Sequence, residues 1–275
     1  GSARKMNRSG YLKRPDCSIY YEVMGVGPAI VFAHGLGGNQ LSWWQQLAHF
    51  SARHSCVAFA HRGFTPSSAV PGATAPDAYA DDLAALIEEL KLRDVRLVAQ
   101  SMGGWTCMEY ALRHPGTVRS LVMASTSGTL DFRQLQGPAK AEIAQWMGQA
   151  PKTMADLEKR DILVAHGERM AREQPAAAVL YRQISQLTPA DFKAEVRAKI
   201  FQMRNRPPAL LAGLSLPVLF LTGDEDCLFP SAAGPAFAAL APKGRAVRVP
   251  HAGHSVYFER PAEFNRIVEE FHAAT

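Results

Sequence analysis

The sequence predicts an α/β protein with a doubly wound, mostly parallel sheet and an inserted helical cap. Three observations lead to this fold class. Short apolar runs bounded by turn residues recur along the 275-residue chain, and amphipathic helical patterns lie between them. In one long stretch, residues 129–211, the strand signal stops and only helical patterns continue. Alternating strands and helices indicate parallel strands joined by crossover helices, and the long stretch indicates an insertion between two of them.

The expected strands are apolar along nearly their whole length, as strands covered by helices on both faces should be. The first, residues 18–23, alternates between apolar and polar residues instead. The others are expected at 29–33, 56–60, 95–99, 120–124, 217–222 and 246–249.

Helices fit between these strands. Residues 77–90 place Leu83, Ile87 and Leu90 at the three-and-four spacing of a half-buried helix. Residues 102–112 begin directly after a strand, and residues 231–240 and 261–271 bring the chain to its end. Pro261 suits the first turn of the last helix.

The insertion is too long to be a loop. It is charged, contains several methionines, and is interrupted by prolines. Ligands of open α/β sheets bind at the carboxyl ends of the strands, so we expect residues 129–211 to form a cap over that edge. The core then comprises residues 15–128 and 212–275.

The positive net charge of +5 does not indicate a nucleic-acid partner. Five basic residues precede the first acid, Asp16, and the rest of the chain is balanced; they are Arg4, Lys5, Arg8, Lys13 and Arg14. Residues 1–14 are therefore expected to be a basic tail or a cloning remnant, with Gly1-Ser2 ahead of a possible native start at Met6.

The four cysteines, Cys17, Cys56, Cys107 and Cys227, are far apart, so neither a disulfide framework nor a zinc site is expected. No segment has the length of a signal peptide or a membrane span. We expect a cytoplasmic protein without a membrane partner that acts on a small molecule. The sequence leaves its oligomeric state open.

Ser101 is the candidate nucleophile. The strand at 95–99 runs into Gln100-Ser101-Met102-Gly103-Gly104 and then a helix, which places Ser101 on a sharp strand-to-helix turn. The small residues Ala99 and Gly103 leave the hydroxyl exposed, and the helix N-terminus behind it favours developing negative charge.

A serine hydroxyl needs a base and a group that orients the base. The strand ending at Thr222 is followed by an acid-bearing turn with Asp224 and Asp226, and the strand ending at Val249 is followed by His251 and His254. An oxyanion needs preorganised donors. The loop His34-Gly35-Leu36-Gly37-Gly38 and the serine turn offer the backbone N–H groups of Leu36 and Met102.

This order of motifs resembles the α/β-hydrolase superfamily over nearly the whole chain. The His-Gly-x-Gly loop, the serine turn, the Gly-x-x-Asp turn and the Gly-His-Ser loop follow one another in the family order. Two departures are visible: Ala99 replaces the first glycine of the serine turn, and His61-Arg62-Gly63 stands where the family often has an aspartate.

The resemblance implies roles for three side chains. Ser101 would be the nucleophile, His254 the base and Asp226 the orienting acid. His254 and Asp226 are chosen because each stands at the position that the family motif gives to that role. Asp224 and His251 are the alternatives, with Asp224 better suited to stabilising the turn. No third ligand accompanies the two histidines, so no metal and no cofactor are expected.

The sequence therefore predicts a cofactor-independent serine hydrolase of a small ester or lactone. The alternatives are a carbon–carbon bond hydrolase of a diketone, a non-hydrolytic enzyme of this fold such as a cofactor-free dioxygenase or lyase, and a ligand-binding receptor without turnover. Candidate substrate-pocket residues are Trp43, Trp105, Phe229 and Val256, for which plain core packing is the alternative.

Overall fold

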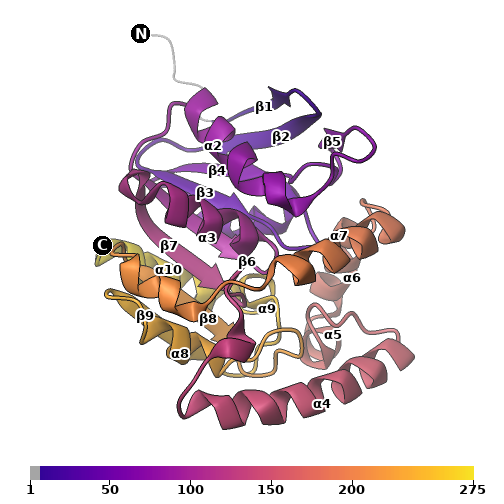
Figure 1. The fold of residues 1–275 in the computed structure, drawn as a ribbon. Coiled ribbons are helices and arrows are strands. Elements are labelled where there is room, and N and C mark those ends of the chain that lie inside the picture. The colour runs from indigo at the N-terminus through magenta and orange to yellow at the C-terminus, as the bar shows by residue number, and fades with distance from the viewer. Residues whose placement is uncertain (1–6) are drawn as a thin grey trace.

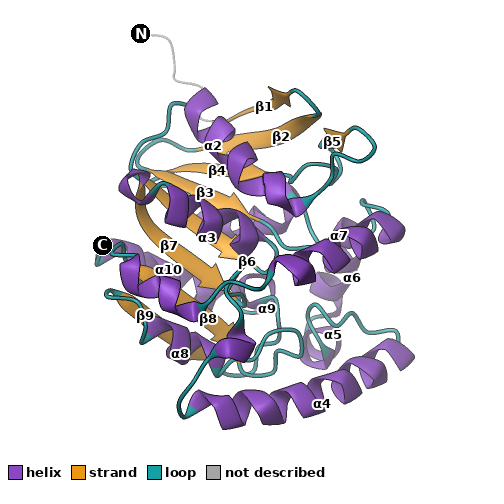
Figure 2. Ribbon diagram, in the orientation of Figure 1, coloured by secondary structure: helices purple, strands orange, loops and turns teal. Residues whose placement is uncertain are grey.

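The computed structural model describes residues 7–275, which form a single sheet flanked by helices (Figures 1 and 2). The strands are β1 (Asn7–Arg14), β2 (Cys17–Met24), β3 (Ala29–Ala33), β4 (Ser55–Phe59), β5 (Ser68–Ala69), β6 (Val95–Gln100), β7 (Val118–Ala124), β8 (Val218–Gly223) and β9 (Gly244–Val249). Their order is β1-β2-β4-β3-β6-β7-β8-β9, and the short β5 pairs with β2. From β4 to β9 all neighbours are parallel, whereas β1, β2 and β5 pair antiparallel. The predicted fold class is confirmed.

Helices cover both faces of the sheet (Figure 2). They are α1 (Trp44–Phe50), α2 (Tyr79–Glu89), α3 (Gly103–Arg113), α4 (Ala139–Lys159), α5 (Glu168–Glu173), α6 (Pro175–Ser185), α7 (Ala190–Met203), α8 (Ala233–Ala238), α9 (Val256–Glu259) and α10 (Pro261–Ala273), with short 3-10 turns at Gln40–Trp43, Pro76–Ala78, Pro115–Thr117, Phe132–Gln134 and Pro208–Gly213. Successive strand residues point to opposite faces, so each strand contributes to two cores.

Strand β3 illustrates this division. Val31 and Ala33 pack in the cluster that contains residues of α2, α3 and α8. Ile30 and Phe32 pack in the second cluster, with residues of α1, α9 and α10. Because both faces are buried, β3 is apolar throughout, which explains why its sequence predicts a strand so clearly.

The N-terminal segment differs from the expectation. Residues 7–14, which we assigned to a basic tail, form β1 and pair with the whole of β2. This is an edge strand that buries mainly Leu12, so its sequence lacks the apolar run of a central strand. Residues 1–6, including the Gly1-Ser2 that we expected to be a cloning remnant, lie outside the described residues.

The stretch between β7 and β8 is helical. It carries α4, α5, α6 and α7, which lie at one end of the sheet, along the right side and the bottom of Figure 1. Helix α4 continues through Pro151. No helix among residues 7–275 is both long and apolar enough to cross a membrane.

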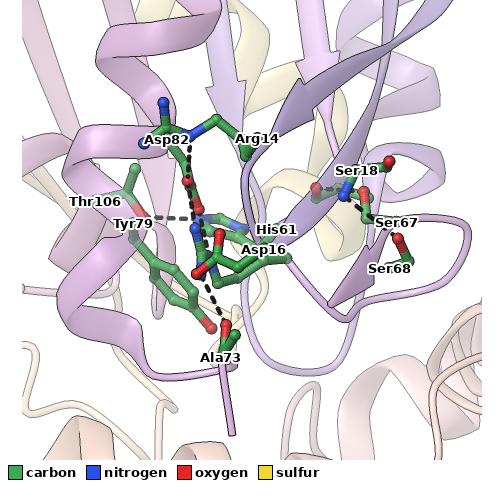
Figure 3. Close-up of polar contacts among 12 residues, drawn as sticks. Arg14, Asp16, Ser18, His61, Ser67, Ser68, Ala73, Tyr79, Asp82 and Thr106 are labelled. Atoms are coloured by element: carbon green, nitrogen blue, oxygen red, sulfur yellow. Dashed lines mark hydrogen bonds and ion pairs between the residues drawn. The ribbon is translucent and has the colours of Figure 1, made fainter. Parts of the chain in front are cut away.

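An ion cluster around the buried pair of Arg62 and Asp82 connects β1 and the β1–β2 turn to helix α2. The guanidinium of Arg62 binds both carboxylate oxygens of Asp82 on α2 at 2.7 Å each. Its Nη1 also donates to Asp16 at 2.9 Å and to the carbonyl of Ala73 at 2.7 Å. Figure 3 shows Asp16, Asp82 and Ala73 gathered in this cluster, with Arg14 on Asp82.

Candidate active site

Ser101 lies on a strained turn between β6 and α3. Its φ is +49°, in the left-handed region that costs a residue with a side chain about 1 kcal/mol or more. A Cβ on Gly103 would collide with the carbonyl oxygen of Ala33 in β3, which explains why a glycine stands there. The turn is held by the backbone N–H of Ser101, which donates to Ala124 O at 3.0 Å. The conformation directs the hydroxyl out of the sheet edge.

Ser101, His254 and Asp226 form one chain of hydrogen bonds. Nδ1 of His254 lies 2.8 Å from Oδ2 of Asp226, and Nε2 lies 2.9 Å from Oγ of Ser101. With Nδ1–H donating to the carboxylate, Nε2 is left to accept the serine proton. The other oxygen of Asp226 accepts the backbone N–H groups of Leu228 at 2.7 Å and Phe229 at 3.0 Å. The carboxylate is therefore fixed on both sides.

The two alternative side chains lie outside this arrangement. Asp224 is bound by the exposed Arg248 at 3.0 Å. His251 is exposed, and its backbone carbonyl accepts the Arg260 guanidinium at 2.9 Å.

Leu36 and Met102 line the same cavity as Ser101 and His254. Neither of their backbone N–H groups donates to an acceptor among residues 7–275. A Cβ on Gly35 would clash with the side chain of Gln100, so the loop before Leu36 packs directly on the serine turn. Two free N–H groups beside a serine hydroxyl can stabilise an oxyanion.

The site cavity has a volume of about 460 Å³. Of the four aromatic and aliphatic candidates, Trp105 and Phe229 line it. Trp43 and Val256 do not: both are buried in the core around α1, α9 and α10, where the Trp43 ring lies 4.6 Å from that of Tyr257. Those two expectations were wrong, because the side chains face the opposite side of their elements.

The helical insertion contacts both loops of the site. From α4, the Trp146 indole donates to the backbone carbonyl of Asp226 at 2.8 Å. From α6, the Tyr181 hydroxyl lies 2.9 Å from Oγ of Ser255, the residue after His254. The insertion also lines the cavity through residues of α4, α6 and α7. The wall of the cavity is therefore divided between the core and the insertion.

His34, in the loop after β3, and His61, in the loop after β4, are structural. His34 Nε2 accepts the backbone N–H of His61 at 2.9 Å, and His61 Nε2 lies 2.7 Å from the hydroxyl of Thr106. Burial lowers the pKa of His34 to about 4 and that of His61 well below its usual value. Both rings are neutral, and they position the Leu36 loop from inside the protein.

Glu259 and the hydroxyl residues that follow β7 belong to the site, although the sequence did not predict them. The Glu259 carboxylate accepts the backbone N–H groups of Gly253 and Ser255 at 2.8 Å each, on both sides of His254. Ser125 lines the cavity with a φ of +53°, and its hydroxyl has no partner among residues 7–275. Two features of the sequence could have indicated these residues: an acid five residues after His254, and a run of hydroxyl residues directly after a strand.

Glu259 gives the fold a pH dependence. Burial raises its pKa to about 8, despite the two N–H donors, and the nearby charge of Asp226 adds to the effect. The pKa of this carboxyl in the unfolded chain is near 4.5. At a pH between 4.5 and about 8, the folded protein therefore keeps a proton on Glu259 that the unfolded chain releases. The stabilisation is complete below the unfolded value and is lost as the pH rises toward 8.

When the pH is raised from ~5 to ~8.5, we expect the free energy of unfolding to fall further in the wild type than in Glu259→Gln. Urea unfolding at both pH values measures this. Glu263→Gln, on the exposed side of α10, is the matched control and should follow the wild type. An unchanged gap between wild type and Glu259→Gln across this range would mean that Glu259 does not titrate there.

Metal and redox sites are not evident in the described part of the chain. No group of three His, Cys, Asp or Glu side chains among residues 7–275 is arranged to hold a metal ion. The four cysteines are free and buried. Burial raises the pKa of Cys227 to about 12, so this thiol beside Asp226 is held protonated.

Known proteins resemble this chain over most of its length. The model of the alpha/beta hydrolase fold matches residues 28–261. The non-heme bromoperoxidase BpoC of Mycobacterium tuberculosis, as that protein is named, is 30% identical over 262 residues, covering 94% of this chain and 98% of the relative. The 3-oxoadipate enol-lactonase 2 of Acinetobacter baylyi is 25% identical over 262 residues, covering 94% of each.

Solved structures agree on the fold. A thermophilic esterase from Thermogutta terrifontis superposes with a TM-score of 0.76 at 22% identity, covering 97% of this chain and 98% of that one. The sheet order, the matched family model and these relatives lead to one conclusion: the chain belongs to the α/β-hydrolase fold family and is an enzyme of that family.

Proposed function

We propose that the protein is a cofactor-independent serine hydrolase of a small ester or lactone. The observation that carries the proposal is the hydrogen-bond chain from Ser101 Oγ through His254 to Asp226, opening into a cavity. Relatives named as an enol-lactonase and an esterase act on the same classes of bond.

The geometry supports a two-step acyl transfer. His254 Nε2 takes the proton of Ser101 as Oγ attacks the substrate carbonyl carbon, and Asp226 stabilises the imidazolium through Nδ1–H. The N–H groups of Leu36 and Met102 hold the negative oxygen. His254 then protonates the leaving oxygen. A water, deprotonated by the same nitrogen, releases the acid from Ser101 in the second step.

In this proposal the helical insertion is the cap of the site. Three observations support that role: Trp146 contacts the acid turn, Tyr181 contacts the histidine loop, and residues of α4, α6 and α7 line the cavity. A cap that is bonded to both loops excludes water from the acyl-enzyme and selects the substrate.

Turnover of p-nitrophenyl esters of increasing acyl length, without added metal, tests the proposal. We expect turnover by the wild type and a loss of at least about 10³-fold in kcat for His254→Ala, since the base is removed. The matched control is His251→Ala, three residues away and exposed, which should stay within about twofold of the wild type. Equal losses in both variants, or turnover that survives His254→Ala, would contradict this assignment of the base.

A further inference from the structure

Basic side chains on one face of α7 line the active-site cavity. Lys193, Arg197 and Ile200 lie three or four residues apart, and Arg204 follows directly after the helix; all four line the cavity that holds Ser101 and His254. This spacing places them along one stripe of the helix. Glu158 is the one acidic side chain among the lining residues.

Lys193, Arg197 and Arg204 lack the carboxylate partners that neighbouring cations have. No carboxylate among residues 7–275 lies within ion-pair distance of any of them. Lys193 Nζ donates to the neutral Ser185, at 2.6 Å to the carbonyl and 3.0 Å to Oγ. By contrast, Lys199 on the same helix pairs with Glu195 at 3.2 Å.

Arg204 is the most constrained of the three. Its guanidinium carbon lies 4.4 Å from the ring centre of Phe132 and 5.3 Å from that of Phe201. Its Nε is buried without an acceptor among residues 7–275. The nearby Asp131 is already held by Arg133 at 2.9 Å. The aromatic faces therefore hold the guanidinium plane in place while its hydrogen-bond donors stay free.

Lys193 and Arg204 are half-buried and Arg197 is exposed. Removing a cation even partly from water without a counterion is costly, so the arrangement gains free energy when an anion enters. Burial lowers the pKa of both Arg204 and Lys193, which reflects that cost. A carboxylate matches the planar fork of a guanidinium through two parallel hydrogen bonds. The cavity volume of about 460 Å³ suits a small acyl group rather than a large anionic cofactor.

We propose that the cavity binds substrates that carry a carboxylate in addition to the ester or lactone carbonyl, with Arg204 as its anchor and Lys193 and Arg197 beside it. This substrate class rests on the proposed function for the reacting carbonyl. The anion site itself rests only on the contacts of α7 and Arg204, so binding and turnover test the two separately.

Binding is measured by calorimetry on the Ser101→Ala protein, which cannot turn over a substrate by the proposed route. The probes are the monomethyl esters of glutarate, adipate and pimelate, which keep one free carboxylate, each beside the neutral methyl ester of the monocarboxylic acid of equal chain length. We expect the best half-ester to bind at least about tenfold more tightly than its neutral counterpart, or about 1.4 kcal/mol. In Arg204→Met this ratio should fall to near one, because methionine keeps contact with Phe132 and removes the charge.

Lys199→Met is the matched control, since it removes one charge from the same helix outside the cavity. It should keep the preference for the half-ester. Thermal unfolding checks that each variant is folded. Equal binding of half-ester and neutral ester, binding of neither, or a preference that survives Arg204→Met would overturn the anion site.

Turnover separates this inference from the proposed function. The pair is mono-p-nitrophenyl adipate and p-nitrophenyl hexanoate, with kcat/KM measured for wild type and Arg204→Met. A wild-type preference of about tenfold for the adipate ester that is lost in Arg204→Met supports the anion site. Equal turnover of both esters by the wild type overturns it and leaves the serine hydrolase standing. Arg204-dependent binding of half-esters without turnover of either p-nitrophenyl ester supports the anion site and contradicts the serine hydrolase.

Discussion

Replacing Ser101 with alanine should lower kcat for ester hydrolysis by about 10⁴- to 10⁶-fold. The hydroxyl is the atom that His254 Nε2 meets at 2.9 Å, and without it neither the acyl-enzyme nor its hydrolysis can occur. Residual turnover should remain, because the N–H groups of Leu36 and Met102 still polarise a carbonyl. Steady-state kinetics on the best ester of the series measures the loss.

The backbone at this position supplies a control for folding. Alanine keeps a Cβ at φ +49° and should leave the thermal midpoint near that of the wild type. Glycine is free of the left-handed penalty, so Ser101→Gly should be more stable than wild type by up to about 1 kcal/mol while equally inactive. This combination of gained stability and lost activity identifies a strained functional residue. Substantial turnover by either variant would contradict the nucleophile.

Replacing Arg62 with methionine should destabilise the fold by about 3–5 kcal/mol. Arg62 and Asp82 are each 3% exposed, so the substitution leaves a carboxylate buried with only Arg14, at 3.1 Å, to compensate it. Asp82 raises the pKa of Arg62, as expected for so close a pair. Urea unfolding at neutral pH measures the change.

Two further variants show whether the loss comes from the buried position of the Arg62–Asp82 pair. Arg113→Met breaks an ion pair with Asp81 in which the side chains are 44% and 65% exposed, and should cost less than about 1 kcal/mol. Its longer contact with the buried Glu109, at 3.7 Å, is also lost, but Arg206 still holds that carboxylate at 2.9 Å. Arg62→Met combined with Asp82→Leu removes both charges and should recover part of the loss. If Arg62→Met cost no more than Arg113→Met, the cluster would not stabilise the fold.

Much of the chemistry could be read from local sequence. Central strands such as β3 and β6 are apolar on both faces, and the turn at Ser101 needs small neighbours, so both leave a signature within a few residues. Family register then placed Asp226 and His254, and the structure brings them within 2.8 Å of each other. The edge strand β1 escaped detection because it buries so little.

Side-chain direction was beyond the sequence. Trp43 and Val256 have the composition of pocket residues, yet both face the core around α9 and α10. Glu259 acts on the histidine loop only because a short helix, α9, folds its carboxylate back onto Gly253 and Ser255. Such contacts depend on how elements pack, which no spacing rule contains.

The fold class and the order of the motifs follow from the amino-acid sequence, because they depend on local constraints: burial of a strand on both faces, a tight turn at Ser101, and an acid and a histidine after successive strands. The choice of Asp226 and His254 over Asp224 and His251 came from the resemblance to the family. Which face of α7 lines the cavity, with Lys193, Arg197 and Arg204, was a choice that tertiary packing alone could make. That choice was made by the docking of α7 against the core, where the Trp105 indole donates to the Ile200 carbonyl at 3.1 Å and so fixes which face of the helix is turned inward.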